Sequence, residues 1–128
     1  MNRINAFLLL ASLLSAPFVA AGEAPCKAPT TSAEVAACEA SRLEADERTL
    51  NEAYRRLLKD LDSPEPKDRE TRAILVKAQR HWVAFREQDC KAKLVARGDA
   101  SLRHWYHQNC LREHAKLRTR QLNEFRMD

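Results

Sequence analysis

The residues best suited to bind a metal gather in the last third of the chain. His104, His107, Cys110 and His114 recur at steps of three and four, which places them along one side of a helix. Imidazole and thiolate groups at this spacing can chelate a transition metal. A solvated histidine-rich face is the alternative. We favour it, because an oxidised Cys110 cannot ligate and no carboxylate is obviously directed there, and we predict no metal and no cofactor.

Two pairs of carboxylates have a spacing that could support hydrolysis of a glycoside. Glu44 with Glu47, and Asp60 with Asp62, could act as acid and base. They fall among Lys and Arg on predicted helix surfaces, without a sheet or long loop to form a cleft. The chain also lacks a GxSxG motif, and with only two glycines it has no glycine-rich phosphate loop. Disulfide-bonded cysteines are not nucleophiles, so we predict a protein that is not an enzyme.

The first 21 residues have the pattern of a cleaved secretory signal. Arg3 supplies a positive charge, residues 6–14 form an apolar run too short to span a bilayer, and small residues precede position 22. We expect cleavage after Ala21 and no membrane anchor in the mature form. The protein would then lie in the periplasm or be secreted. Residues 22–30 would be an arm, and residues 31–128 a single helical domain.

Four cysteines follow the predicted signal: Cys26, Cys38, Cys90 and Cys110. An even number of cysteines in a small exported chain indicates two disulfides. The long spacings, without a CxxC motif, argue against a zinc site. Spacing leaves the connectivity open, because Cys90 can face Cys38 across one expected turn or Cys110 across the other. Among the three pairings we prefer Cys26–Cys38 with Cys90–Cys110.

Basic and acidic side chains nearly balance. Once Arg3 is removed with the signal, 21 Lys and Arg face 18 Asp and Glu, a net charge of +3 with neutral histidines. Opposite charges alternate along the chain, which is typical of solvated helices rather than of a nucleic-acid surface. Export also removes nucleic acid as a partner. A modest attraction to an anionic cell-wall polymer remains.

Composition and end signals predict an all-α fold. The chain is poor in glycine and rich in residues that favour helices. Thr31 and Glu34 fit a capping box, which begins a first helix that ends near residue 61. We expect acidic residues early and basic residues late in this helix to match its dipole. Its predicted buried residues are Leu43, Leu50, Ala53, Tyr54, Leu57 and Leu61.

Two further helices follow short turns. Prolines in the turn at 62–66 precede a second helix that ends near residue 97, where Gly98 provides the left-handed terminating residue. Asp99 or Ser101 would cap a third helix, over about 102–126. Short turns make neighbouring helices antiparallel, so we predict an antiparallel three-helix bundle stapled by two disulfides. Predicted apolar positions of the third helix are Leu102, Trp105, Tyr106, Leu111, Leu117, Leu122 and Phe125.

The second helix carries the pattern around which the chain is organised. Its predicted buried stripe is Leu75, Ala78, Trp82, Phe85 and Asp89, bordered by Gln79, Arg86 and Cys90. We expect the Trp82–Phe85 seam to be the centre of the core. A cation this close to the core requires a counter-charge, since an unpaired buried charge costs several kcal/mol. We therefore predict that Arg86 pairs with Asp46 or Asp89 and fixes the register of the helices.

Residues in all three helices resemble those of the LprI-type family of small exported proteins, which are lysozyme-inhibitor-like. The most specific part is the run AQxxWxxFRxxxC, and the resemblance covers about residues 26–125. The residues that carry it and that we assign to the structural core or family motif are Asp46, Leu50, Asn51, Tyr54, Gln79, Trp82, Phe85, Arg86 and Arg118. The resemblance implies a helical envelope or secreted domain with disulfides, and lysozyme inhibition is the activity attached to the family name.

Two functions follow as hypotheses. The first is an exported, non-enzymatic binding protein that inhibits lysozyme by inserting a tip, formed by Arg97, Gly98 and Asp99, into a cleft whose catalytic groups are carboxylates. Many lysozymes are basic, so a domain of net charge +3 would gain no long-range steering. The alternative is an envelope interaction module that binds another periplasmic protein or an anionic cell-wall polymer.

Overall fold

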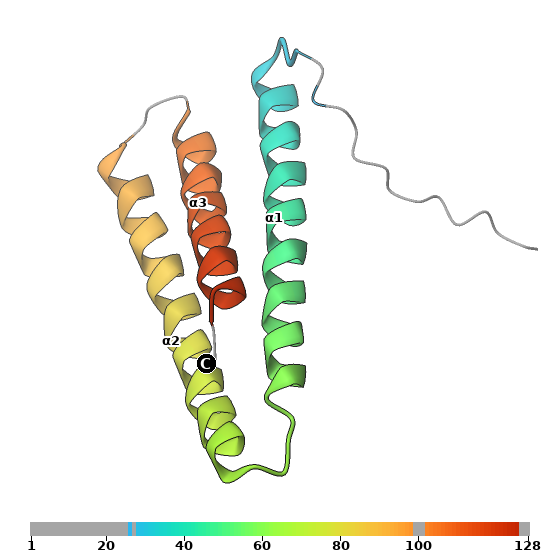
Figure 1. The fold of residues 1–128 in the computed structure, drawn as a ribbon. Helices are drawn as coiled ribbons and strands as arrows, with labels where there is room; N and C mark the ends of the chain where they lie inside the picture. The colour runs from blue at the N-terminus through green and yellow to red at the C-terminus, as the bar shows by residue number, and fades with distance from the viewer. Residues whose placement is uncertain (1–25, 27, 99–101, 126–128) are drawn as a thin grey trace, which may run out of the picture.

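The computed structural model describes residues 26, 28–98 and 102–125. Within these ranges the chain forms three helices, α1 (Ser32–Asp60), α2 (Pro66–Ala96) and α3 (Arg103–Asn123), and no strand (Figure 1). The predicted all-α fold is confirmed, and each helix begins and ends within a few residues of its predicted bounds. The predicted signal at 1–21 and most of the predicted arm at 22–30 lie outside the described residues.

The first helix starts as the sequence predicts. The backbone N–H of Glu34 donates to the Thr31 hydroxyl at 3.2 Å, and the Glu34 carboxylate accepts from the Thr31 backbone N–H at 3.0 Å. These reciprocal bonds form the capping box and satisfy backbone donors that the first turn leaves without partners. At the other end of α1 the backbone N–H of Leu61 donates to the carbonyl of Leu57, and this closes the last turn.

The ends of α2 and α3 are formed in different ways. Pro66 is the first residue of α2, where its missing N–H costs nothing. Gly98 follows α2 with a φ of +58°, so the predicted left-handed residue is confirmed. The residue that caps α3 is Leu102, without a side-chain hydrogen bond. The predicted caps, Asp99 and Ser101, lie outside the described residues.

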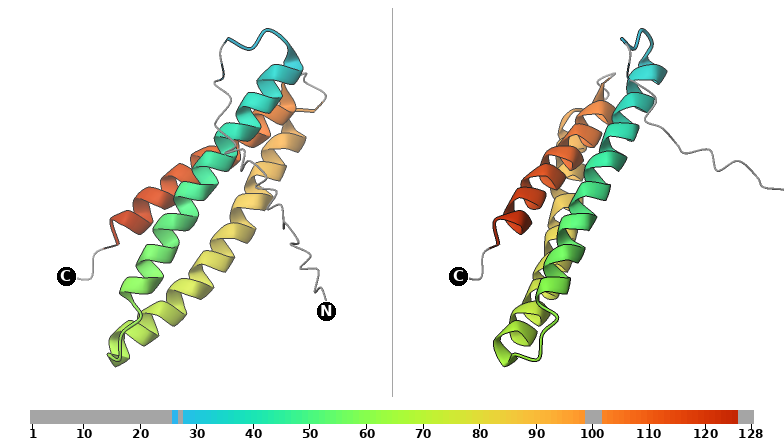
Figure 2. Two further views of the ribbon diagram at one scale, coloured as in Figure 1. Left: turned by 90° about the vertical axis from the view of Figure 1, so that its right-hand side faces the viewer. Right: turned by 45° about the vertical axis from the view of Figure 1, so that its right-hand side comes forward.

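The three helices run side by side, with α1 and α3 in one direction and α2 in the other (Figures 1 and 2). The closest backbone packing is between α1 and α3, followed by α2 and α3, whereas α1 and α2 approach each other closely at few points. The shorter α3 ends before it reaches the loop that joins α1 to α2 (Figure 1). The first and last helices therefore form the main interface of the bundle.

The core is a small cluster of aliphatic residues from all three helices. Its buried members are Leu50, Ala53, Leu57, Leu61, Leu75, Ala115 and Leu122, and the side chains of Tyr54, Leu58 and Trp82 pack against them. The predicted stripe of the first helix is confirmed, since four of its residues are buried and the other two are half-buried. Of the apolar positions in the third helix, Leu122 is buried, whereas Leu102, Leu117 and Phe125 are 46%, 45% and 41% exposed.

The prediction that the Trp82–Phe85 face of the second helix is the centre of the core is wrong. Phe85 is 59% exposed and Ala78 is exposed. Leu75 of the predicted stripe is buried, and the other buried residues of α2 are those that the sequence placed at its border, namely Gln79, Arg86 and Cys90. Trp82 is half-buried beside them. The helical period was right, but the buried face of α2 lies a fraction of a turn away from the face chosen from apolar residues alone.

Two disulfides link the chain, Cys26–Cys38 and Cys90–Cys110, with Cα–Cα distances of 5.4 and 5.6 Å. The preferred pairing is confirmed. The first bridge joins the segment before α1 to its second turn, and the second joins α2 to α3 near the end where they are connected. Among the described helices, none combines the length and apolar character needed to cross a membrane.

Candidate functional site

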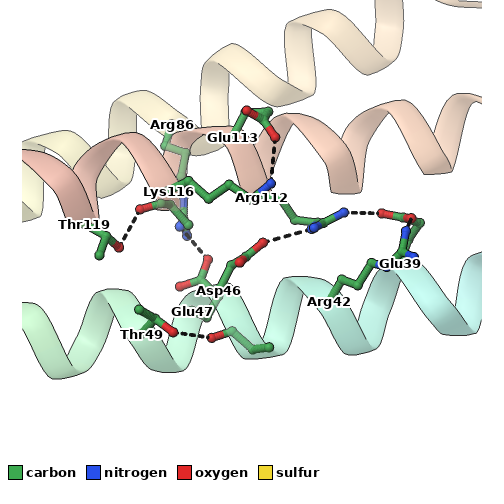
Figure 3. Close-up of polar contacts among 12 residues, drawn as sticks. Glu39, Arg42, Asp46, Glu47, Thr49, Arg86, Arg112, Glu113, Lys116 and Thr119 are labelled. Atoms are coloured by element: carbon green, nitrogen blue, oxygen red, sulfur yellow. Dashed lines mark hydrogen bonds and ion pairs between the residues drawn. The ribbon is translucent and has the colours of Figure 1, made fainter. Parts of the chain in front are cut away.

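An ionic network joins α1 to α3 (Figure 3). Arg112 of α3 donates to Glu39 at 2.7 Å and to Asp46 at 2.9 Å, and Arg42 donates to the other Glu39 oxygen at 2.7 Å. Burial alone would raise the pKa of Glu39, but hydrogen bonds from Arg112 and Arg42 outweigh burial and hold that pKa below its usual value. Glu39 is therefore ionised at neutral pH, and the network sets the register of α1 against α3.

Arg86 lies buried between α2 and α1, and its predicted partners are wrong. It donates to Glu47 of α1 at 2.5 Å and to Glu87 at 3.0 Å. Asp46 and Asp89 instead accept hydrogen bonds from side chains of α3. The reason is that α1 packs mainly on α3, so Asp46 faces α3. Its neighbour Glu47, about 100° further round the helix, faces α2.

Trp82 is enclosed by two guanidinium groups. Arg86 lies 5.0 Å and Arg118 5.8 Å from its ring centroid, which are cation–π distances. The Nε of Arg118 donates to Gln79 at 2.9 Å, and burial lowers the pKa of Arg118. These four residues come from the AQxxWxxFR run and from α3. Gln79, Trp82 and Arg86 of the most specific motif therefore contribute to the interior of the bundle.

The remaining motif residues divide between core and surface. Leu50 is buried, and Tyr54 packs half-buried against the core. Asn51 and Phe85 are exposed. The Phe85 ring meets the His114 ring edge-on, with centroids 5.8 Å apart, so Phe85 lies on the side of α2 that faces α3. The sequence alone did not distinguish these exposed positions from the buried ones.

A groove of about 700 Å³ lies between the C-terminal half of α2 and the facing side of α3, and we call it the α2–α3 groove. It is lined by Lys93, Ala96, Arg97, Tyr106, Asn109, Cys110, Glu113, His114, Leu117 and Arg120. Two arginines, one lysine and one histidine stand beside a single carboxylate, Glu113, so basic groups outnumber acidic ones in the lining. Alanine, leucine and the disulfide supply an apolar surface between the charges.

Arg97 of the predicted tip lines this groove. The Arg97 guanidinium stacks on the Tyr106 ring, 3.8 Å from its centroid, and the residue remains exposed to solvent. Gly98 is also exposed, and its carbonyl accepts a hydrogen bond from Arg103 at 3.3 Å. Asp99, the third predicted tip residue, lies outside the described residues. The structure thus brings Arg97 and Gly98 together with a groove that the sequence did not reveal.

The Cys90–Cys110 disulfide lies beside three polar side chains. His114 Nε2 lies 2.9 Å from Asp89 Oδ2, and Lys93 Nζ lies 2.7 Å from the same oxygen and 3.7 Å from Cys110 Sγ. Hydrogen bonds from Lys93 and His114 lower the pKa of Asp89. Cys90 is fully buried. The cluster combines sulfur, imidazole and carboxylate at one wall of the groove.

This cluster differs from the histidine set considered from the sequence. Of that set, Cys110 and His114 belong to it, whereas His104 and His107 do not. Asp89 and Cys90 of α2 complete the group, and their contribution becomes visible only when the disulfide sets α2 against α3. The carboxylates considered for hydrolysis have other roles where they are paired. Glu44 binds Arg48 and Glu47 binds Arg86, so both act as counter-charges.

The groove was missed because its lining comes from two helices. Lys93 and Arg97 are one turn apart at the end of α2, and Tyr106, Leu117 and Arg120 lie within about four turns of α3. None of these spacings is distinctive within one helix. Once the Cys90–Cys110 pairing is assumed, however, it places the last turns of α2 opposite the first turns of α3. That register was the signal that could have located the groove.

Taken together, these features define a small helical protein whose bundle is stapled by two disulfides and carries a groove with a mainly basic lining between α2 and α3. The family model described as Lysozyme inhibitor LprI matches residues 26–122, and the chain belongs to this LprI family. The resemblance seen in the sequence is confirmed by this match. No curated protein and no solved structure matches the chain.

Proposed function

We propose that this chain is an exported, non-enzymatic binding protein of the cell envelope that inhibits lysozyme. The family description supports the target. Export to the periplasm or the exterior is part of the proposal, and so is removal of residues 1–21. Two disulfides support it, because disulfides persist in oxidising compartments outside the cytosol.

The observation that carries the proposal is the stacking of Arg97 on Tyr106 in the lining of the groove. A lysozyme cleft contains catalytic carboxylates, which attract a cation. A flexible arginine would lose side-chain entropy on insertion, whereas the stacked guanidinium is already held. The nearby Cys90–Cys110 bridge fixes α2 against α3, so Arg97 can enter a cleft with little further ordering. The expected contact is therefore a preorganised cation at the lysozyme active site.

Inhibition is tested with the mature protein, purified with both disulfides formed, by following lysis of a cell-wall suspension by lysozyme. We expect lysis to slow as the protein is added, and Arg97→Glu to raise the concentration for half inhibition at least about tenfold, since a buried charge reversal costs several kcal/mol. The matched control is Arg80→Glu, because Arg80 is exposed and does not line the groove. Unchanged lysis at a large molar excess of the protein would refute the proposal.

A second candidate function rests on the charge of the groove. Lys93, Arg97 and Arg120 line it together, and they face one carboxylate of the lining, Glu113. An anionic cell-wall polymer, or an acidic patch on another periplasmic protein, would find matching charges there. Retention of the protein on the polymer that falls steeply with salt would support this alternative. A specific partner captured from periplasm, with no inhibition of lysozyme, would favour the protein partner.

A further inference from the structure

Four potential metal ligands converge where α2 and α3 are bridged. Asp89 and Cys90 are consecutive in α2, and Cys110 and His114 are one turn apart in α3. One ligand atom from each lies within 4.8 Å of the ligand atoms of the other three. His114 Nε2 and Asp89 Oδ2 are 2.9 Å apart, and the two sulfurs are bonded to each other.

The ligand types suit zinc, and their atoms lie close enough together to share one ion after a small adjustment. Two thiolates, one imidazole and one carboxylate are all zinc ligands, and structural zinc sites hold four ligands in a tetrahedron. With metal–ligand bonds of about 2.0–2.3 Å, tetrahedral ligands lie roughly 3.3–3.8 Å from one another. The present atoms all lie within 4.8 Å of one another, and the disulfide holds the two sulfurs nearer together than two ligands of one ion. A small rotation of each cysteine side chain would separate them once that bond is broken.

We propose that the dithiol form of this protein binds one Zn²⁺ through Cys90, Cys110, His114 and Asp89. Every disulfide protein is synthesised with free thiols, so this form precedes the bridged one. The bridged form lacks the two thiolates and cannot hold the same ion. Zinc and the disulfide would therefore be alternative links between α2 and α3, each excluding the other.

The surroundings allow a metal to enter. Cys110 and His114 line the α2–α3 groove, which opens to solvent, whereas Cys90 is fully buried and would be the innermost ligand. Lys93 now donates to Asp89 at 2.7 Å and must leave when the metal arrives. Its side chain is 57% exposed, so it can move into solvent. Asp89 would exchange one cationic partner for another.

A phosphine can serve as the reductant that converts the Cys90–Cys110 disulfide to two thiols. The phosphine gives two electrons to the Cys90–Cys110 bond and takes an oxygen from water, so the sulfur–sulfur bond breaks, two thiols form and the phosphine becomes its oxide. Zn²⁺ then replaces the two thiol protons, which pass to the buffer. In the reverse direction a small-molecule disulfide accepts two electrons, the bridge reforms and the ion is released.

The test uses the mature chain with Cys26→Ser and Cys38→Ser, so that only the second pair of cysteines can respond. After anaerobic reduction by a water-soluble phosphine, we expect one equivalent of Zn²⁺ to bind, measured by competition with a chromogenic chelator. Bound Co²⁺ should show thiolate-to-metal absorption typical of a tetrahedral site. The oxidised protein should bind neither ion.

Two histidine variants separate the proposed site from binding by thiols alone. His114→Ala should weaken Zn²⁺ binding at least about tenfold, whereas His104→Ala, an exposed histidine outside the cluster, should not change it. Circular dichroism follows folding in parallel, and a reduced chain that is unfolded without metal should regain helix when Zn²⁺ is added. Equal affinity of the two variants, less than one equivalent bound, or equal binding by the oxidised protein would each overturn the proposal. None of these outcomes tests lysozyme inhibition by the oxidised protein, so the zinc proposal and the proposed function can fail separately.

Discussion

Arg86 of α2 and Glu47 of α1 lie 2.5 Å apart, nitrogen to oxygen, and join two helices whose backbones approach closely at few points. The Arg86 side chain is 9% exposed and that of Glu47 30% exposed. The same guanidinium lies over the Trp82 ring. This pair therefore links the hairpin of α1 and α2 where apolar packing between them is sparse.

Replacement of Arg86 by methionine should destabilise the protein. The change leaves Glu47 without its partner and removes the contact with Trp82, so we expect a loss of about 2 kcal/mol in the free energy of unfolding. Chemical denaturation of the purified protein measures it. Arg48→Met is the matched control, because the Arg48–Glu44 pair is 55% and 74% exposed and should contribute less than about 0.5 kcal/mol. A variant at Arg86 with wild-type stability and lost binding would instead make Arg86 a functional residue.

The rotation of α2 is tested by truncating two of its side chains. Phe85→Ala should cost less than about 1 kcal/mol, because the ring is 59% exposed and its ring contact is with His114. Leu75→Ala, at a residue 5% exposed, should cost about 2–5 kcal/mol. Thermal unfolding followed by circular dichroism ranks the two variants. The reverse order would restore the seam predicted from the sequence.

Phe85 and Leu75 also show how much of the fold could be predicted from the sequence. Local signals placed the helix ends, because the Thr31–Glu34 box and Gly98 act through their own neighbours in the chain. The period of apolar residues identified α2 as amphipathic, but Phe85 and Leu75 both fit that period. Choosing between them requires knowing where along α2 the helices α1 and α3 cover it. How the neighbouring helices cover α2 depends on tertiary packing, and the sequence of one helix alone does not contain this information.

The partner of Arg86 could not be predicted from the sequence for the same reason. Asp46 and Glu47 are adjacent and chemically similar, so either could pair with Arg86 in a sequence-based hypothesis. The choice depends on about 100° of rotation around α1. The groove likewise depends on how helices face each other, since Arg97 and Arg120 belong to different helices. The Cys90–Cys110 bridge, which was one of several pairings open to the sequence, supplies the register that decides such questions.

Acid should weaken the network between α1 and α3. The pKa of Glu39 in the folded protein lies below its usual value of 4.5. Its stabilising effect is therefore fully present above about that pH and is lost as the pH falls through the lower, folded value. Glu39→Gln should cost about 1–3 kcal/mol at pH 7, and the difference from wild type should shrink toward pH 3.

Urea midpoints at the two pH values measure this effect. Glu52→Gln serves as the control, because Glu52 is an exposed carboxylate of the same helix and its substitution should change stability little at either pH. If the penalty of Glu39→Gln stays constant between pH 7 and pH 3, the hydrogen bonds from Arg112 and Arg42 do not depend on ionisation of Glu39.

Gly98 should resist substitution because of its backbone alone. A Cβ added there would meet no atom within 4 Å, but the φ of +58° is unfavourable for residues with side chains. We expect Gly98→Ala to lower stability by about 1 kcal/mol, and Gly98→Asn by less, since asparagine tolerates this conformation better. Differential scanning calorimetry compares them. Equal melting temperatures for glycine, asparagine and alanine would mean that the turn relaxes to negative φ.

The parallel packing of α1 on α3 has a consequence for biosynthesis. The ribosome makes the Ser32–Asp60 segment before the Arg103–Asn123 segment. The core leucines of α1 therefore cannot be covered by α3 until α3 has been made. Such long-range closure delays collapse until the chain is nearly complete. A nascent chain without its C-terminal segment would therefore remain open. The architecture itself would thus leave this face of α1 uncovered until the last helix has been made.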